Sequence, residues 1–104
     1  MSQDIYLTGI TTTGTPHIGN YVGAIKQWIA HQADYDNLFC IVNLHALTIP
    51  ERMRPGELKR KTQEVAGLYL ACGIDPKHSV IFVQSDVPAH AELAWILNCV
   101  TPIG

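Results

Sequence analysis

The sequence predicts an α/β fold, namely a Rossmann-like parallel sheet in which strands and helices alternate in βαβαβα order. Three short, β-prone runs of apolar residues are each followed by a segment in which apolar side chains recur every three or four positions, as in a helix. Two of these runs are continuously apolar, which is typical of strands buried on both faces of a parallel sheet. At 104 residues, the chain has the length of one domain.

The first strand is expected over residues 5–8 and should stop at Gly9. A loop of small polar residues follows it. From His17 onward, apolar side chains return at helical spacing. This helix should end near residues 34–37, where turn-forming residues gather.

The second and third units repeat this order. A strand is expected over residues 38–42, and a helix should run from Pro55 in its first turn to Gly73 at its C-terminal cap. A third strand over residues 80–83 precedes a helix opened by Pro88. This is the layout of a nucleotide-binding half-domain, in which ligands gather at the carboxyl ends of the strands, so the three following loops should converge.

Composition excludes several classes of protein. With 7 Lys and Arg against 9 Asp and Glu, the net charge of −2 argues against binding nucleic acid through bulk charge. Charged residues make up only 15%, against roughly 25% in an ordinary domain, so part of the surface should be covered by a partner chain or by further sequence. No apolar run approaches the roughly 20 residues that span a membrane. The scattered Cys40, Cys72 and Cys99 predict buried, reduced thiols in a cytoplasmic protein.

The loop after the first strand has features of a phosphate cradle. Gly9 and Gly14 permit tight turns and close approach to a ligand, and three threonine hydroxyls lie between them, at residues 11–13. The spacing of the two glycines imitates a P-loop, but Thr15 and Pro16 occupy the positions of its Lys and Ser or Thr. These two residues argue against a Walker-type ATPase, and an ordinary βα turn remains the alternative for the loop alone.

His17 and Asn20 strengthen the functional interpretation. They share one face of the first helical turn, where both could donate hydrogen bonds to phosphate oxygens as charge builds in a transition state. Gly19 between them costs a helix about 1 kcal/mol relative to Ala, and its bare backbone would let a flat base lie against it. The alternative is that His17 only caps the helix, while Gly19 and Gly23 allow close packing.

Residues 14–21, Gly-Thr-Pro-His-Ile-Gly-Asn-Tyr, resemble the HIGH-type motif of the class I aminoacyl-tRNA synthetases, in the form typical of tryptophanyl-tRNA synthetases. The resemblance continues through residues 39–46, 68–76, 81–85 and 87–91, nearly the whole chain. It implies that residues 1–104 are the amino-terminal part of a catalytic domain, a HIGH-type nucleotide-binding half-domain. The KMSKS-type loop and the anticodon-binding helical region of such enzymes are absent, so the chain by itself should not be fully active.

The resemblance also implies roles for individual residues. The predicted ATP-binding residues are Thr11, Thr12, Thr13, His17, Gly19 and Asn20. Of these, His17 and Asn20 are the predicted catalytic residues. The predicted tryptophan-binding residues are Leu7, Gly9, Val42 and His45. The residue that accepts the indole N–H lies in sequence beyond Gly104 in the family.

The chain departs from the family pattern at three places. Many relatives have Pro-Ser where this chain has Thr12-Thr13, Thr where it has His17, and Asp-Gln where it has Asn43-Leu44. These departures concern the phosphate geometry and the hydrogen bonds of the second loop, and they leave the fold unchanged.

The implied function is that of a tryptophan–tRNA ligase, which activates L-tryptophan with ATP to tryptophanyl-adenylate and transfers it to tRNA(Trp). The resemblance implies a cytoplasmic homodimer away from membranes, with ATP as substrate, Mg²⁺ accompanying it, and no protein-bound metal. Three alternatives stay open. They are a tyrosyl-tRNA synthetase relative, a small adenylyltransferase with the same loop, and a catalytically silent domain that binds ATP or a partner protein.

For the remaining candidate features, a structural explanation fits better than a functional one. The five histidines lack metal-ligand spacing. Five basic residues at positions 52, 54 and 59–61 fit a solvated helix start better than an RNA contact. Trp28 and Trp95 are predicted in the core or an interface, and Tyr69, Cys72 and Trp95 could alternatively face a partner subunit.

Overall fold

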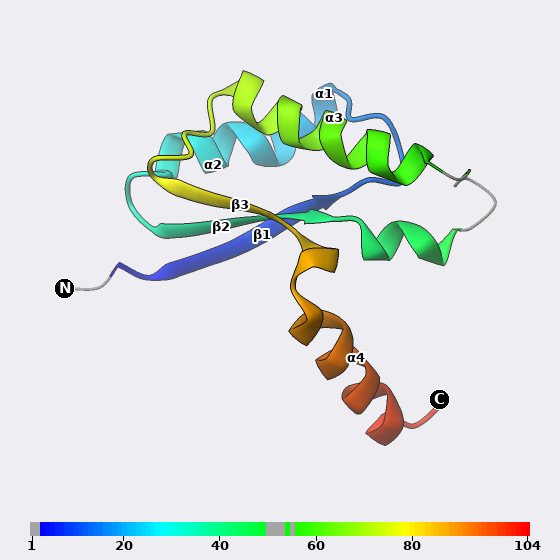
Figure 1. Cartoon of the computed structure of the whole chain (residues 1–104). Helices are drawn as coiled ribbons and strands as arrows, with labels where there is room; N and C mark the ends of the chain where they lie inside the picture. Colours follow the sequence, from blue (N-terminus) through cyan, green and yellow to red (C-terminus); the bar gives the residue numbers. More distant parts are fainter. Residues whose placement is uncertain (1–2, 50–53, 55) are drawn as a thin grey trace.

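The computed structural model describes residues 3–49, 54 and 56–104, and confirms the predicted α/β fold. Its sheet has three strands in the order β1-β2-β3, with both neighbouring pairs parallel. Strand β1 covers Ile5–Thr11, β2 covers Asp36–Val42 and β3 covers Ser79–Val83. The carboxyl ends of all three strands therefore lie at the same edge of the sheet (Figure 1).

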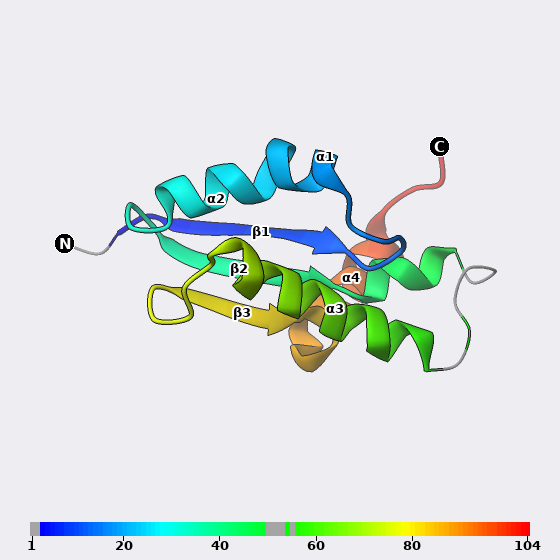
Figure 2. The same cartoon turned by 90° about the horizontal axis from the view of Figure 1, so that it is seen from above.

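The helices form a layer on one face of this sheet. Three consecutive helical segments follow β1: α1 (Ile18–Asn20), the π-helical turn η1 (Tyr21–Ile25) and α2 (Lys26–His31). Helix α3 (Glu57–Cys72) lies beside them over the same face, as Figures 1 and 2 show. Short 3-10 helices follow the other strands, η2 (Leu44–Thr48) and η4 (Gln84–Asp86), and α4 (Pro88–Val100) extends away on the opposite side.

The core lies between the helical layer and β2. Phe39 of β2 stacks on Trp28 of α2, with ring centroids 5.1 Å apart and planes at 17°. Tyr69 of α3 meets Trp28 edge-on at 5.7 Å. The other buried members of this cluster are Ile25, Ile41, Val65 and Ile74. Tyr69 is 0% exposed, so the alternative that it faces a partner subunit is wrong, whereas Trp28 lies in the core as predicted.

Strand β1 is longer than predicted. It continues through Gly9 to Thr11 because these residues pair with Cys40–Val42 of β2. A Cβ atom on Gly9 would lie 2.2 Å from the Cys40 carbonyl oxygen, so only glycine fits this close approach of the two backbones. Tertiary pairing thus overrides the local turn signal of glycine, and the loop begins at Thr12.

Several predicted helix boundaries are confirmed. Gly73 follows α3 with φ of 110°, the left-handed conformation that glycine adopts without strain. Pro88 opens α4. Pro55, predicted in the first turn of α3, lies outside the described residues.

Apolar side chains are exposed on the side of the sheet that faces away from the helical layer. Helix α4 has no buried residue, and its Trp95 is 69% exposed. Leu7 and Val80, on the sheet face away from α2 and α3, are also exposed. This surface agrees with the low content of charged residues in the sequence.

Two further expectations concern the burial of the cysteines and the length and apolar character of the helices. Cys40 is buried and Cys72 half-buried, but Cys99 is exposed on α4, so the prediction of three buried thiols is wrong for Cys99. It fails because the part of α4 that contains Cys99, residues 91–100, is exposed throughout. Within the same residues, no helix has both the length and the apolar character needed to cross a membrane.

Candidate functional site

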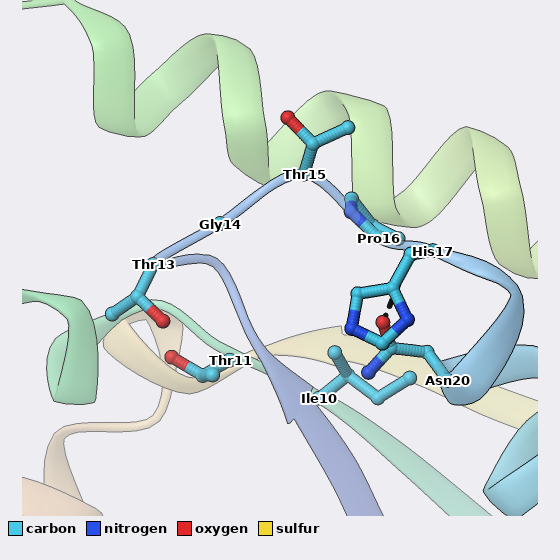
Figure 3. A pocket seen from close by; sticks show the side chains of 8 residues that line it. All are labelled: Ile10, Thr11, Thr13, Gly14, Thr15, Pro16, His17 and Asn20. Carbon is cyan, nitrogen blue, oxygen red and sulfur yellow. Dashed lines mark hydrogen bonds between the residues drawn. The ribbon is translucent and has the colours of Figure 1, made fainter.

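A hollow opens at the carboxyl end of β1, between the following loop and the start of α1 (Figure 3). Its lining residues are Ile10, Thr11, Thr13, Gly14, Thr15, Pro16, His17 and Asn20. The volume is about 190 Å³. Pockets that enclose a whole drug-sized ligand measure roughly 300–1,000 Å³, so this hollow suits part of a nucleotide. Four of the predicted ATP-binding residues line it. The other four lining residues, which were not predicted to bind ATP, are Ile10, Gly14, Thr15 and Pro16.

His17 and Asn20 hold each other in place at the start of the helix. His17 is the N-cap, and its Nδ1 accepts a hydrogen bond from the Gly19 N–H at 3.0 Å. The Asn20 Oδ1 accepts from the His17 N–H at 2.9 Å, which completes a capping box. The capping role considered from the sequence is therefore present, and it fixes both side chains at the hollow.

This capping leaves a specific set of free groups. Because Nδ1 of His17 is an acceptor, the neutral imidazole carries its proton on Nε2, which remains free to donate. Asn20 uses its carbonyl oxygen in the cap, so its amide NH₂ also remains. None of the described residues that line the hollow carries a carboxylate. Free donors without a negative charge beside them suit an anion.

The structure explains the glycine at position 19 differently from the sequence analysis. A Cβ atom there would lie 2.7 Å from Cε1 of the His17 ring, so a larger residue would push the imidazole away. Gly19 itself does not line the hollow. At Gly23 a Cβ atom would meet nothing within 4 Å in the described structure, so close packing does not explain that glycine.

The threonines of the loop divide into two kinds. Thr11 and Thr13 line the hollow, whereas Thr12 is buried beneath it. The hydroxyls of Thr11 and Thr12 are shielded from solvent and have no hydrogen-bond partner among the described residues. An unsatisfied buried polar group costs about 1–3 kcal/mol, so such groups call for a ligand or water as partner.

The four predicted tryptophan-binding residues lie apart from this hollow. Leu7, Gly9 and Val42 share the sheet face opposite the helical layer, as the strand register shows. Leu7 is 57% exposed, and His45 lies exposed on η2. Within the described residues, none of these four residues lines the hollow.

Asn43 and Ser85 form a link that was not predicted. The Asn43 amide donates to the Ser85 hydroxyl at 2.8 Å, and its carbonyl oxygen accepts from the Ser85 N–H at 3.1 Å. The pair joins the loops after β2 and β3, two of the three loops expected to converge. An amide residue directly after a buried strand was the available signal. An aspartate at this position could also accept both hydrogens of Ser85.

Two of the basic residues of α3 form local ion pairs. The Arg60 guanidinium contacts the Glu64 carboxylate, and Lys61 Nζ lies 3.8 Å from Glu57. This agrees with a solvated helix start. Arg52 lies outside the described residues.

Comparison with known proteins identifies the class. The family model for tRNA synthetases class I (W and Y) matches residues 2–104. The chain belongs to this family.

Its relatives include many tryptophan–tRNA ligases. The chain is 60% identical over 97 residues to that of Thermosynechococcus vestitus, which covers 93% of this chain and 29% of that protein. It is 53% identical over 104 residues to that of Helicobacter pylori, covering 100% of this chain and 31% of that protein. These relatives confirm the predicted resemblance to tryptophanyl-tRNA synthetases. The chain spans less than a third of their length.

Solved structures of tryptophanyl-tRNA synthetases are similar to this chain in their fold. Tryptophanyl-tRNA synthetase from Campylobacter jejuni, complexed with ADP and tryptophan, has a TM-score of 0.82 at 43% identity, over 94% of this chain and 30% of that one. The enzyme from Mycoplasma pneumoniae has a TM-score of 0.87 at 28% identity, over 98% of this chain and 29% of that one. The match confirms the class I synthetase fold.

Proposed function

We propose that this protein acts as a tryptophan–tRNA ligase and that the hollow after β1 binds the phosphates of its ATP. One observation carries the proposal. The capping box leaves the Nε2–H of His17 and the NH₂ of Asn20 free at a hollow without carboxylates. The relatives named above support the choice of substrates, because they are ligases for tryptophan and one was solved with ADP and tryptophan.

In the proposed reaction, the carboxylate of tryptophan attacks the α-phosphorus of ATP. A new oxygen–phosphorus bond forms, the bond to the bridging oxygen breaks, and pyrophosphate leaves with the electron pair. The 3′-terminal ribose hydroxyl of tRNA then takes the acyl group and AMP leaves. The substrate supplies the nucleophile, so the protein contributes positioning and charge stabilisation. His17 and Asn20 donate to phosphate oxygens as negative charge develops on them.

The remaining ATP-binding residues have supporting roles in this proposal. Thr13 lines the hollow together with Thr11, whose own hydroxyl is shielded from solvent, Thr12 is a buried residue of the same loop, and Gly19 makes room for the imidazole. Mg²⁺ enters bound to the triphosphate, since the described lining residues of the hollow include no carboxylate to hold it.

Tryptophan is proposed to bind beside ATP, on the surface that contains Leu7, Gly9, Val42 and His45. This surface adjoins the end of β1, so an amino acid lying there can present its carboxylate toward the hollow. We propose that residues 1–104 form the amino-terminal part of the catalytic domain. A cytoplasmic homodimer belongs to the same proposal, supported by free cysteines and by the exposed apolar residues of α4.

Amino-acid-dependent exchange of labelled pyrophosphate into ATP by the full-length protein tests this function. Tryptophan should support exchange, and tyrosine should support at least 100-fold less at equal concentration. Exchange with tyrosine alone would instead show the tyrosine-specific branch of the same family. ATP binding without any exchange would indicate a catalytically silent domain and would refute the ligase.

A further inference from the structure

The hydroxyl of Tyr69 bridges two strands of the sheet. Tyr69 belongs to α3, and its Oη accepts a hydrogen bond from the Ile10 N–H of β1 at 3.0 Å. The same oxygen donates to the Cys40 carbonyl of β2 at 3.3 Å. A wholly buried helical side chain thus binds the backbone of two adjacent strands at once.

The bridge lies where β1 ends and the hollow begins. Ile10 is itself a lining residue and directly precedes Thr11. Gly9 directly precedes Ile10 in β1. At Gly9 the two strands come so close that a Cβ atom would lie 2.2 Å from the Cys40 carbonyl oxygen. The Tyr69 hydroxyl therefore holds the end of β1 against β2, directly before the loop that lines the hollow.

Packing alone does not explain a tyrosine at this position. The ring contacts Trp28 and Phe39 edge-on, and a phenylalanine ring would make the same contacts. A phenylalanine would lack the hydroxyl that accepts the hydrogen bond from the Ile10 N–H. Burial raises the pKa of the Tyr69 phenol well above its usual value of 10.0, although the hydrogen bond from Ile10 acts in the opposite direction. The phenol therefore stays protonated and keeps its donor.

We propose that Tyr69 is a positioning residue for ATP, acting through the end of β1 to hold the following loop in place at the phosphates. The inference rests on the proposed ATP site. Without the hydroxyl, the end of β1 gains freedom, so the loop must be ordered when ATP binds, and ATP affinity falls. Tyr69 touches no substrate.

The test compares Tyr69→Phe with Val65→Ala in the full-length protein. Val65 lies on the same buried face of α3, one turn earlier, and its alkyl side chain cannot form a hydrogen bond. We expect Tyr69→Phe to raise the Kd and KM for ATP roughly three- to tenfold, the effect of about one hydrogen bond. Its KM for tryptophan should change less. Val65→Ala should lower the thermal midpoint at least as much and leave ATP affinity within twofold.

Deuterium exchange of the Ile10 amide tests the hydrogen bond to Tyr69 itself. The Ile10 amide should exchange with deuterium at least tenfold faster in Tyr69→Phe than in Val65→Ala, because only the former removes its acceptor. Equal ATP affinities in the two variants, or unchanged Ile10 exchange, would overturn the positioning role. Wild-type protein that binds ATP but exchanges no pyrophosphate would refute the ligase alone, since the calorimetric Kd still tests Tyr69.

Discussion

His17 and Asn20 each perform two tasks with different atoms. One heteroatom of each side chain completes the helix cap, and the remaining nitrogen is left as a donor at the hollow. The sequence presented capping and phosphate binding as alternatives, but the tautomer that the cap selects is the one that leaves Nε2–H free. A substitution must therefore separate the two tasks.

Asn20→Asp makes this separation. An aspartate oxygen can still accept from the His17 N–H, and a negative charge near a helix N-terminus is favourable, so stability should stay within about 1 kcal/mol of wild type. The donor is lost and a charge faces the phosphates, so kcat/KM for ATP should fall about 100-fold or more. Chemical denaturation and steady-state exchange measure the two effects. Unchanged kcat/KM would remove Asn20 from the site.

Replacing His17 or Asn20 by Ala should affect the chemical step more than tryptophan binding. Each Ala variant loses about 1 kcal/mol of cap stability and also a donor to the phosphates. In single-turnover experiments we expect adenylate formation to slow about 100-fold. Tryptophan affinity, from calorimetry, should change less than threefold. Equal losses in both quantities would contradict the assigned role.

Gly9 is expected to be intolerant of a side chain. Gly9→Ala places a methyl group against the Cys40 carbonyl, so the strands must separate, at a cost of about 1–3 kcal/mol. Gly67→Ala is the control, because its Cβ atom meets nothing within 4 Å and Ala favours the interior of α3 by about 1 kcal/mol. Urea denaturation should show opposite signs for the two variants. A neutral Gly9→Ala would show that the strands are less tightly apposed than described.

At the scale of elements, apolar periodicity predicted every strand and long helix. It failed where pairing across the sheet decides the structure. Gly9 reads locally as a strand end, yet β1 continues because β2 offers partners up to Val42. The π-helical turn of η1 and the Asn43–Ser85 link depend on contacts that no local pattern encodes. The loop and helix start of the site were predictable because they are contiguous in sequence.

The loop between α3 and β3 makes a pH-dependent contribution to stability. The hydrogen bond from the Lys77 N–H is the main cause that holds the pKa of Asp75 below its usual value of 3.8. Partial burial acts in the opposite direction, and the side chain of His78 lowers the pKa further. A lowered folded-state pKa gives stability that is present above pH 3.8 and is lost as the pH falls through the folded value. Thermal midpoints of Asp75→Asn should therefore converge with wild type in strong acid. A constant difference from pH 7 downward would contradict this.

In the whole molecule, one side of the sheet is covered by helices, and the other exposes apolar groups, including Leu93, Trp95 and Ile96 of α4. In the proposed homodimer this side is the contact surface. We expect Trp95→Glu to convert the full-length dimer to monomer in light-scattering measurements. Leu70→Glu, at an exposed position on α3, should leave the dimer intact. A Trp95→Glu protein that remains dimeric would show that α4 is not the contact.

In the proposed function, the loop after β1 and the helix start hold the phosphates of ATP. A crystal structure of the full-length protein with ATP tests this binding most directly. We expect phosphate oxygens about 2.7–3.2 Å from Nε2 of His17 and the amide nitrogen of Asn20, with the capping box unchanged. Phosphates bound elsewhere, or side chains turned away from the hollow with ATP in place, would contradict it.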